Sequence, residues 1–344
     1  MRAAHIVQNG APEEAIEIVD VDTPDPGPEE VRVRIEVCAL NHKDVFARVG
    51  HPNREDVFPK RVGTDVAGVV DEVGKNVTEW EQGDRVVLYP RAYCDECEWC
   101  LNGEHTMCEN PRQIGNDIPG GLAEYATFPA FILESIPDDV DFVTAASWPV
   151  TFTTAWRMIS TAGQLRPSES SLILGASGGV GNAALQIANR IGAFTYATTS
   201  LEEKAEKLRD TTEAVIDYTA VDFSEEIMER TDGRGVDLVA DHIGQDTWQT
   251  SIDSLAKNGR MVICGATSGP DPDIDIRSVY QNHRRIIGAP LGNRQDFRDV
   301  GRLVYAGELV PQIDRVLPLD GFVEGSRVLE EREAVGKIVI EPRE

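Results

Sequence analysis

The chain has 344 residues, of which 41% are hydrophobic and 27% are charged. This length exceeds one ordinary core, so we expect two domains, and the composition is globular rather than disordered. No stretch approaches the about 20 continuous apolar residues of a membrane span, and residues 1–7 lack a signal-peptide pattern. The simplest interpretation is a cytoplasmic enzyme with no membrane partner.

The chain is strongly acidic, because it has 59 acidic and 33 basic residues and a net charge of -26. Such a surface repels itself in dilute buffer, and salt screens that repulsion. We therefore expect adaptation to high intracellular salt rather than an ordinary acidic protein, which a stability series in KCl would test. Nucleic acid is excluded as a partner, since no basic stripe is present to contact phosphates.

The first third of the chain is predicted to be β-rich. Residues 31–37 alternate between apolar and polar side chains, as in a half-buried strand, and residues 65–73 and 84–88 are further strand candidates. Short strands separated by Gly and Pro turns are typical of a compact barrel-like domain.

From about residue 150 strands and helices alternate. We expect strands at 171–174, 194–197, 214–216, 236–240 and 260–264, and helices at 180–191, 202–208 and 223–230. This order predicts βαβ units and a parallel sheet covered on both faces. After about residue 290 the chain looks irregular, and it ends in a strand candidate at 336–340. The predicted domains are therefore 1–151 with 291–344, and 152–290 inserted between them.

A glycine-rich loop joins the first strand of the inserted domain to its first helix. The run Gly175-Ala-Ser177-Gly178-Gly179-Val180-Gly181 has the composition that lets a backbone approach a pyrophosphate at a helix N-terminus. Gly178 and Gly179 would face the phosphates, and Gly181 would let the helix pack closely. The alternative is a tight turn without a ligand. We predict a nicotinamide cofactor.

The end of the next strand selects between NADH and NADPH. An NAD site usually has Asp or Glu there for the ribose 2′-hydroxyl. Here residues 197–204 read Ala-Thr-Thr-Ser-Leu-Glu-Glu-Lys, with hydroxyls at the tip and Lys204 four residues after Ser200. Hydroxyls and a cation suit a 2′-phosphate, so NADPH is expected. A solvated Lys204 paired with a neighbouring Glu is the alternative.

Four of the six cysteines lie within fifteen residues. Cys94, Cys97, Cys100 and Cys108 follow the spacing of a tetrahedral four-cysteine zinc site, which leaves no open position for chemistry. One structural zinc per chain is therefore expected in a lobe at about 91–110, with four reduced thiols as the alternative.

These motifs together resemble the medium-chain dehydrogenase/reductase superfamily, in particular its zinc alcohol dehydrogenases and quinone reductases. The resemblance rests on residues 63–74 and 83–86, on residues 120–125 and on the glycine loop. It implies an α/β fold in which a GroES-like β-rich catalytic domain accompanies a Rossmann domain with a doubly wound parallel sheet. It also implies a homodimer or homotetramer.

The resemblance implies further cofactor contacts. Tyr218 corresponds to a position that contacts the 2′-phosphate, and Lys337 to a basic position that reaches the cofactor's phosphates. Thr154 and Asn293 correspond to positions near the nicotinamide. Packing or solvent exposure is the alternative for each of these residues.

The positions that bind a catalytic zinc in alcohol dehydrogenases hold Asn41, Thr64 and Val150 here. None is a good zinc ligand, and Cys38 lies three residues too early to replace one. Asn41 and Thr64 could instead bind the oxygen of an acceptor, or simply form the pocket wall. His242, in a segment that resembles acryloyl- and crotonyl-CoA reductases, is the third catalytic candidate, with a structural role as its alternative.

We therefore predict an NADPH-dependent reductase that transfers hydride to a small activated acceptor, namely a quinone, enone or enoyl-CoA thioester, without a catalytic zinc. A zinc-dependent alcohol or polyol dehydrogenase is one alternative. A nucleotide-binding protein without turnover is the other.

Overall fold

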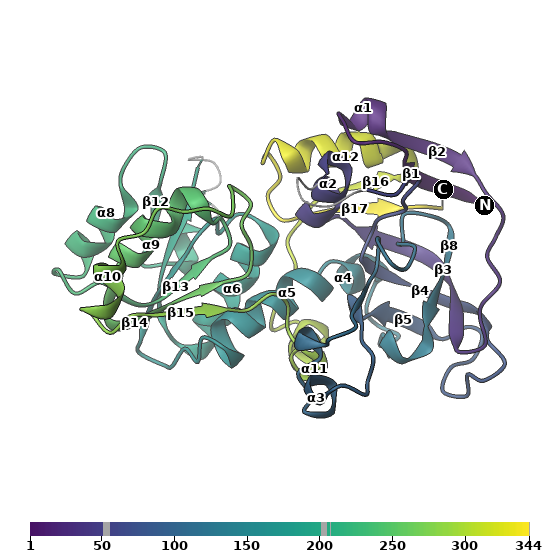
Figure 1. Cartoon of the computed structure of the whole chain (residues 1–344), viewed down its shortest axis with the longest axis horizontal. Helices are drawn as coiled ribbons and strands as arrows, with labels where there is room; N and C mark the ends of the chain where they lie inside the picture. Colours follow the sequence, from purple (N-terminus) through teal and green to yellow (C-terminus); the bar gives the residue numbers. More distant parts are fainter. Residues whose placement is uncertain (51–55, 201–204, 207, 344) are drawn as a thin grey trace. The chain divides into compact units, whose positions relative to one another are not determined.

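The computed structural model describes residues 1–50, 56–200, 205–206 and 208–343 (Figure 1). Contacts divide the chain into unit 1, Met1–Val150 with Val304–Glu344, and unit 2, Thr151–Leu303. The second boundary differs from the position expected from sequence, because residues 291–303 remain with unit 2. Within that segment Asp296 accepts hydrogen bonds from Arg157 and Thr161 of the same unit.

Unit 2 is built on a six-stranded sheet in the order β12-β11-β10-β13-β14-β15. All neighbouring strands are parallel. This is the doubly wound order of a Rossmann domain, with its switch point beside β10. The strands are β10 (Ser170–Ile173), β11 (Phe194–Thr199), β12 (Ala214–Asp217), β13 (Val236–Asp241), β14 (Leu255–Ile263) and β15 (Arg285–Gly288).

Helices connect these parallel strands and cover the sheet. Helix α6 packs on β10 and β11, and α9 packs on β13 and β14 and also contacts α8 (Figure 1). The helices of this unit include α6 (Gly179–Ile191), α8 (Phe223–Arg230), α9 (Trp248–Asp253) and α10 (Ile276–Tyr280). The helix expected at 202–208 falls mainly outside the described residues. Apolar side chains of β10, β13 and α9, such as Leu172, Val239 and Ile252, are fully buried in the core.

Unit 1 is a β-rich domain around the long strand β3, whose alternate residues are buried as the sequence predicts. Its main sheet has the order β16-β17-β3-β4-β5-β9, and β8 also pairs with β3. The strands are β3 (Glu30–Ala39), β4 (Asp65–Val73), β5 (Arg85–Leu88), β8 (Tyr125–Pro129), β9 (Leu133–Ser135), β16 (Ile313–Pro318) and β17 (Lys337–Glu341). The C-terminal strand β17 thus completes a sheet begun near the N-terminus.

Shorter elements complete unit 1. Two separate ribbons are formed by β1 (Arg2–Ile6) with β2 (Ile16–Asp20), and by β6 (Arg91–Ala92) with β7 (Arg112–Gln113). Further α-helices among the described residues are α1 (Pro12–Ala15), α2 (His42–Val49), α3 (Glu98–Leu101), α4 (Phe142–Ala146), α5 (Pro149–Trp156), α11 (Arg294–Tyr305) and α12 (Phe322–Glu330).

The expectation of irregular structure after residue 290 is wrong. Helices α11 and α12 lie there, each with one buried face. In α11, Phe297, Val300 and Val304 repeat at helical spacing and are buried, but charged residues between them hide the pattern. Among helices of the described residues, none is long and apolar enough to cross a membrane.

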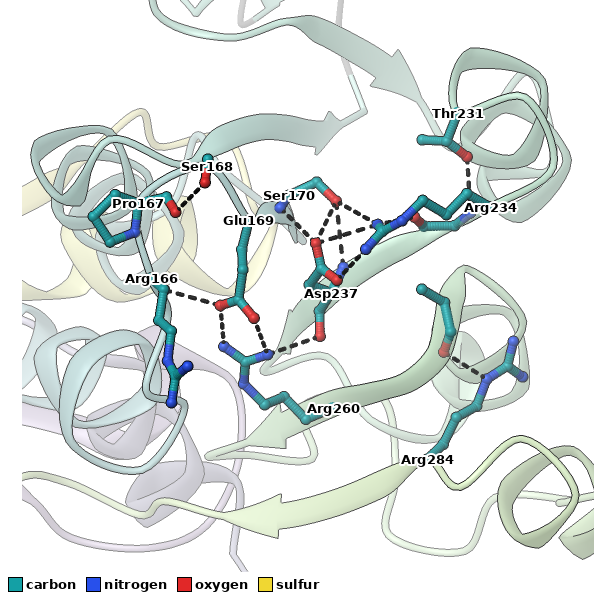
Figure 2. A network of polar contacts seen from close by, with 12 residues as sticks. Arg166, Pro167, Ser168, Glu169, Ser170, Thr231, Arg234, Asp237, Arg260 and Arg284 are labelled. Carbon is teal, nitrogen blue, oxygen red and sulfur yellow. Dashed lines mark hydrogen bonds and ion pairs between the residues drawn. The ribbon is translucent and has the colours of Figure 1, made fainter.

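A polar network ties together the amino ends of β10 and β13 and Arg260 of β14, which lies opposite Leu238 near the start of β13 (Figure 2). The Arg260 guanidinium is buried and donates to Glu169, to the carbonyl of Gln164 at 3.0 Å and to that of Asp237 at 3.2 Å. The Asp237 carboxylate accepts from Ser170 and Arg234. These contacts fix the sheet at the edge opposite the carboxyl ends, where cofactors bind in such folds.

Candidate functional site

The glycine loop lies between β10 and α6, as predicted. Gly175 has a positive φ of 54°, and the helix starts at Gly179 after Gly178 at the N-cap. A Cβ added at Gly181 would lie 2.3 Å from the carbonyl oxygen of Gly175, so the close approach of helix and loop requires glycine there. The first N–H groups of α6 lack intrahelical partners and lie at the positive end of the helix dipole, which suits a phosphate.

Threonines at the carboxyl end of β11 support this loop. The N–H of Gly175 donates to the Thr198 hydroxyl at 3.1 Å, and the Thr199 hydroxyl lies 3.3 Å from that of Ser177. The residue after the strand is Ser200, so the part of the tip that the structure describes carries hydroxyls and no carboxylate. Lys204 lies outside the described residues.

Tyr218 comes to the same tip from β12. Its N–H donates to the carbonyl of Thr199 at 3.3 Å, and the side chain is 38% exposed and so accessible to a ligand. The neighbouring Asp217 carboxylate is turned into its own loop, where it accepts two hydrogen bonds from Thr219 that lower the pKa of Asp217. The tip therefore presents Ser200 and Tyr218.

His242 lies against the glycine loop. A Cβ added at Gly175 would be 3.1 Å from its Nε2 atom, and burial lowers the pKa of His242 below its usual value. The preceding Asp241 is fully buried and accepts from the N–H groups of Ile243 and Gly244 and the hydroxyls of Thr247 and Ser251. The Asp241 carboxylate fixes the loop that carries His242. The His242 side chain therefore lies next to Gly175 of the glycine loop.

Asn293 and Thr154 are both buried in unit 2. The side-chain oxygen of Asn293 accepts from the N–H of Asp296 at 2.9 Å, and the Asp296 carboxylate accepts from the N–H of Asn293 at 2.9 Å. This reciprocal pair is a capping arrangement at the start of α11. This capping arrangement gives Asn293 a structural role at the start of α11.

In unit 1 the strand registers bring three polar residues to one point. Strand β17 runs antiparallel to β3 with Val339 opposite Ala39, and β4 runs antiparallel on the other side with Asp65 opposite Ala39. Asn41 follows the end of β3, Lys337 begins β17 and Asp65 begins β4. All three are buried, with exposures of 7%, 4% and 0%.

The Lys337 ammonium is fully paired in this cluster. It donates to the carbonyl of Leu40 at 2.7 Å, to Oδ1 of Asn41 at 2.8 Å and to Oδ2 of Asp65 at 2.9 Å. These partners account for the three N–H donors of an ammonium. Lys337 was expected at the cofactor's phosphates, and in this arrangement it has no donor left for one.

Asn41 of this cluster is one of the three positions, with Thr64 and Val150, that the family resemblance makes correspond to a catalytic zinc site. Asp65 also accepts from Nδ2 of Asn41 and from the N–H of Val150, both at 2.9 Å. A zinc ion needs thiolate, imidazole or carboxylate donors around it. Here Asn41 offers an amide, Thr64 a hydroxyl and Val150 no donor, while an ammonium already neutralises the carboxylate. These residues do not fit a zinc ion.

Thr64 and Asp44 are buried near Asn41. Thr64 is fully buried, and its hydroxyl is 3.4 Å from the carbonyl oxygen of Ile114. Asp44 accepts from the N–H of Asn41 at 2.9 Å and that of Gly63 at 3.2 Å, and burial raises the pKa of Asp44. Asp44 therefore holds Asn41 at the start of α2.

The four clustered cysteines do fit a metal. Their sulfur atoms all lie within 4.8 Å of one another, and within the described part of the chain they form the one such His, Cys, Asp or Glu group. The Cys94 sulfur is 3.9 Å from that of Cys100 and 3.5 Å from that of Cys108, close to the roughly 3.8 Å of a tetrahedron with Zn–S bonds near 2.3 Å. N–H groups of Glu109 and Cys100 lower the pKa of Cys97 to about 6, which favours the thiolate.

Sequence reasoning missed Asp65, Asp44 and Lys43. Asp65 was treated only as the start of a strand, although it follows Thr64 directly. A signal was available in the scarcity of lysine, since only seven of the basic residues are Lys. Two of these seven, Lys43 and Lys337, stand in or beside the Asn41 cluster.

A Rossmann sheet with a phosphate-binding loop, a β-rich unit with a polar cluster and a four-cysteine lobe define a two-domain nicotinamide oxidoreductase. Two family models match the chain: an alcohol dehydrogenase GroES-like domain at residues 27–138 and a zinc-binding dehydrogenase domain at residues 179–306. The chain belongs to the medium-chain dehydrogenase/reductase superfamily.

Its relatives have more than one activity. Acryloyl-coenzyme A reductase of Sulfurisphaera tokodaii is 31% identical over 96% of this chain and 98% of its own. An NAD-dependent alcohol dehydrogenase of Sulfolobus acidocaldarius is also 31% identical, over 95% of this chain and 96% of its own. A solved NAD-dependent alcohol dehydrogenase is similar in structure, with a TM-score of 0.94, 37% identity and full coverage of both chains. Membership in this superfamily therefore does not determine which nicotinamide cofactor or which acceptor the protein uses.

Proposed function

We propose that this oxidoreductase uses NADPH to reduce an activated acceptor, either a quinone or a carbon–carbon double bond conjugated to a carbonyl group, without a catalytic metal. The observation that carries the proposal is the buried Lys337–Asp65–Asn41 cluster. A hydride acceptor that is already electron-poor needs hydrogen bonds and positive charge for the electrons it gains, rather than a Lewis acid.

Asn41 is the group that we assign to the acceptor's oxygen. Its Oδ1 accepts from the ammonium and one Nδ2 hydrogen goes to Asp65, so the amide cannot flip without opposing like groups. The second Nδ2 hydrogen can donate to the acceptor oxygen, where negative charge develops. Lys337 supports this by placing a positive charge behind the amide. Thr64 then forms part of the wall.

The proposed use of NADPH is based on residues of unit 2. When bound, NADPH supplies the hydride. The N-terminus of α6 and residues Gly178, Gly179 and Val180 suit the pyrophosphate. Ser200 and Tyr218 suit a 2′-phosphate, and the described residues of the β11 tip include no carboxylate of the kind that selects NADH. One structural zinc on the four cysteines would hold its lobe together.

A zinc-dependent alcohol dehydrogenase is the main competing function, because several relatives are named NAD-dependent alcohol dehydrogenase. It would need a Lewis acid to stabilise the alkoxide, and the residues at the corresponding positions offer no suitable donor set. Acryloyl-coenzyme A reductase of Sulfurisphaera tokodaii and the crotonyl-CoA reductase of Streptomyces avermitilis, 30% identical over 97% of this chain, are in keeping with the reductase proposal.

A screen of cofactor oxidation in high KCl tests this function. The enzyme is supplied with NADPH or NADH and with 1,4-benzoquinone, an α,β-unsaturated ketone or crotonyl-CoA. We expect turnover with at least one acceptor and a higher kcat/KM for NADPH than for NADH. If crotonyl-CoA is the substrate, free coenzyme A should compete with it.

Two results would contradict the proposal. Oxidation of simple alcohols with no reduction of these acceptors would favour the dehydrogenase, and cofactor binding without turnover would favour a nucleotide-binding protein. Equal or tighter binding of NADH would refute only the assignment of NADPH as the cofactor.

A further inference from the structure

Two lysines stand at the Asn41 site, and their hydrogen bonding differs. Lys337 has all three of its donors paired. Lys43 is half-buried, and its only partner in the part of the chain that the structure describes is the carbonyl oxygen of Ile114, 3.1 Å from Nζ. An ammonium has three N–H donors, so two of those of Lys43 remain for a ligand or solvent.

The position of Lys43 follows from the same elements that hold Asn41. Lys43 is the second residue of α2, and Asp44 ties the start of this helix to Asn41 and Gly63. The Thr64 hydroxyl is directed at the same Ile114 carbonyl that Lys43 contacts. The lysine therefore reaches around the start of α2 to the wall of the Asn41 site.

Charged groups from four elements act on the Lys43 ammonium. Burial is the largest influence and lowers the pKa of Lys43, while Asp44 of α2, Asp65 of β4 and Asp117 of the loop after β7 oppose this and Arg91 of β6 adds to it. The N-terminal position on α2 also disfavours a cation. The net effect lowers the pKa of Lys43 and makes it a stronger acid than an exposed lysine, while the nearby carboxylates favour its charged form.

We propose that Lys43 is the proton donor of the reduction. This inference rests on the proposed function. Hydride adds to the acceptor's electron-poor atom, the C–H bond of the dihydronicotinamide breaks and the cofactor is oxidised. The acceptor, reduced by two electrons, then carries negative charge as an enolate or a hydroquinone anion. Lys43 gives one proton to it, an N–H bond breaks and a C–H or O–H bond forms, and the neutral amine regains a proton from water.

A purely structural role predicts something different. If Lys43 only tethered the Ile114 loop, Lys43→Arg would serve as well, because a guanidinium keeps both the charge and the hydrogen bond to the carbonyl. Arginine stays protonated at any working pH and so cannot act as the acid. The Arg variant therefore separates proton donation from tethering.

The test compares Lys43→Arg and Lys43→Met with the wild-type enzyme, using whichever of 1,4-benzoquinone, the enone or crotonyl-CoA it reduces fastest. Removing a general acid should lower kcat on the order of 10²-fold in both variants, with KM nearly unchanged in the Arg variant. The wild-type kcat should fall as the pH rises through the pKa of Lys43, because the amine then has no proton to give. This alkaline fall should be absent in Lys43→Arg. Lys75→Met, which removes an exposed lysine from the same unit, should leave the profile unchanged.

The possible outcomes distinguish failure of the Lys43 role from failure of the proposed reductase function. Wild-type turnover with an unaltered kcat and pH profile in Lys43→Arg would overturn the role of Lys43 alone. Absence of wild-type turnover with every acceptor would overturn the proposed function and this role with it. Should Lys43→Met fail to fold, as judged by circular dichroism, the Arg variant still decides.

Discussion

Lys337→Met is expected to destabilise unit 1 by about 3–5 kcal/mol, because it leaves a buried carboxylate without its partner charge. Asp65 has no exposed surface, so water cannot replace the ammonium there. The carbonyl of Leu40 and Oδ1 of Asn41 would lose a donor as well. Chemical denaturation in high KCl, followed by tryptophan fluorescence, measures the change.

Lys337→Met should lower turnover as well as stability. Once Oδ1 of Asn41 has lost its donor, the amide is no longer held in one orientation, and misplacing a group that contacts the acceptor can cost on the order of 10²-fold in rate. The double variant Asp65→Asn with Lys337→Met removes both charges and should be more stable than Lys337→Met alone. A destabilisation below about 1 kcal/mol for Lys337→Met would show that the cluster is not the buried ion pair described here.

Arg260→Met is expected to destabilise unit 2 by about 3 kcal/mol or more. Arg260 is 5% exposed, and its guanidinium donates to Glu169 and to the carbonyl of Asp237 (Figure 2). It also donates to the carbonyls of Gly163 and Gln164. Methionine can fill the volume but cannot donate, so three carbonyls would be left without this donor. Thermal unfolding of the variant in the same salt measures the loss.

Cofactor affinity should be spared in Arg260→Met, because the network lies at the amino ends of the strands and the glycine loop follows the carboxyl end of β10. Arg277→Met is the matched control. It removes the same charge from the same unit, but the Arg277 side chain is 69% exposed and pairs with Asp275 at the surface, so little change is expected. Equal effects of the two substitutions would contradict a structural role for the Arg260 network.

Much of the fold could be predicted because local pattern and tertiary structure agree. The strand at 65–73 and the helix at 223–230 have the predicted bounds, and the glycine loop lies between β10 and α6. Continuous apolar runs bounded by glycines identify buried parallel strands, and a phosphate loop needs its glycines at fixed positions. The four cysteines carry their spacing in the sequence alone, and their sulfur atoms do converge.

The helices after residue 290 were missed because their apolar residues are separated by charged ones. In a chain of this acidity, polar faces are unusually rich in Asp, Glu and Arg. The short strand β8 depends on pairing with β3, which is distant in sequence. Such non-local pairing leaves little trace in local composition.

The Asn41 cluster shows most clearly what sequence could not provide. Asn41 and Lys337 are 296 residues apart, and only the antiparallel register of β17 on β3 brings them together. Resemblance to the family predicted a phosphate contact for Lys337, whereas its ammonium pairs with Asp65. The lack of zinc-binding side chains could be read from the sequence, but the cation that neutralises Asp65 could not.

Metal analysis of the fully active enzyme tests most directly whether turnover proceeds without a catalytic metal ion beside the Lys337 ammonium. After purification in high salt and exhaustive dialysis, we expect about one zinc per chain, bound by the four cysteines, with undiminished reduction of the best acceptor. Two metal ions per chain, with turnover that rises and falls with the occupancy of the second, would contradict it.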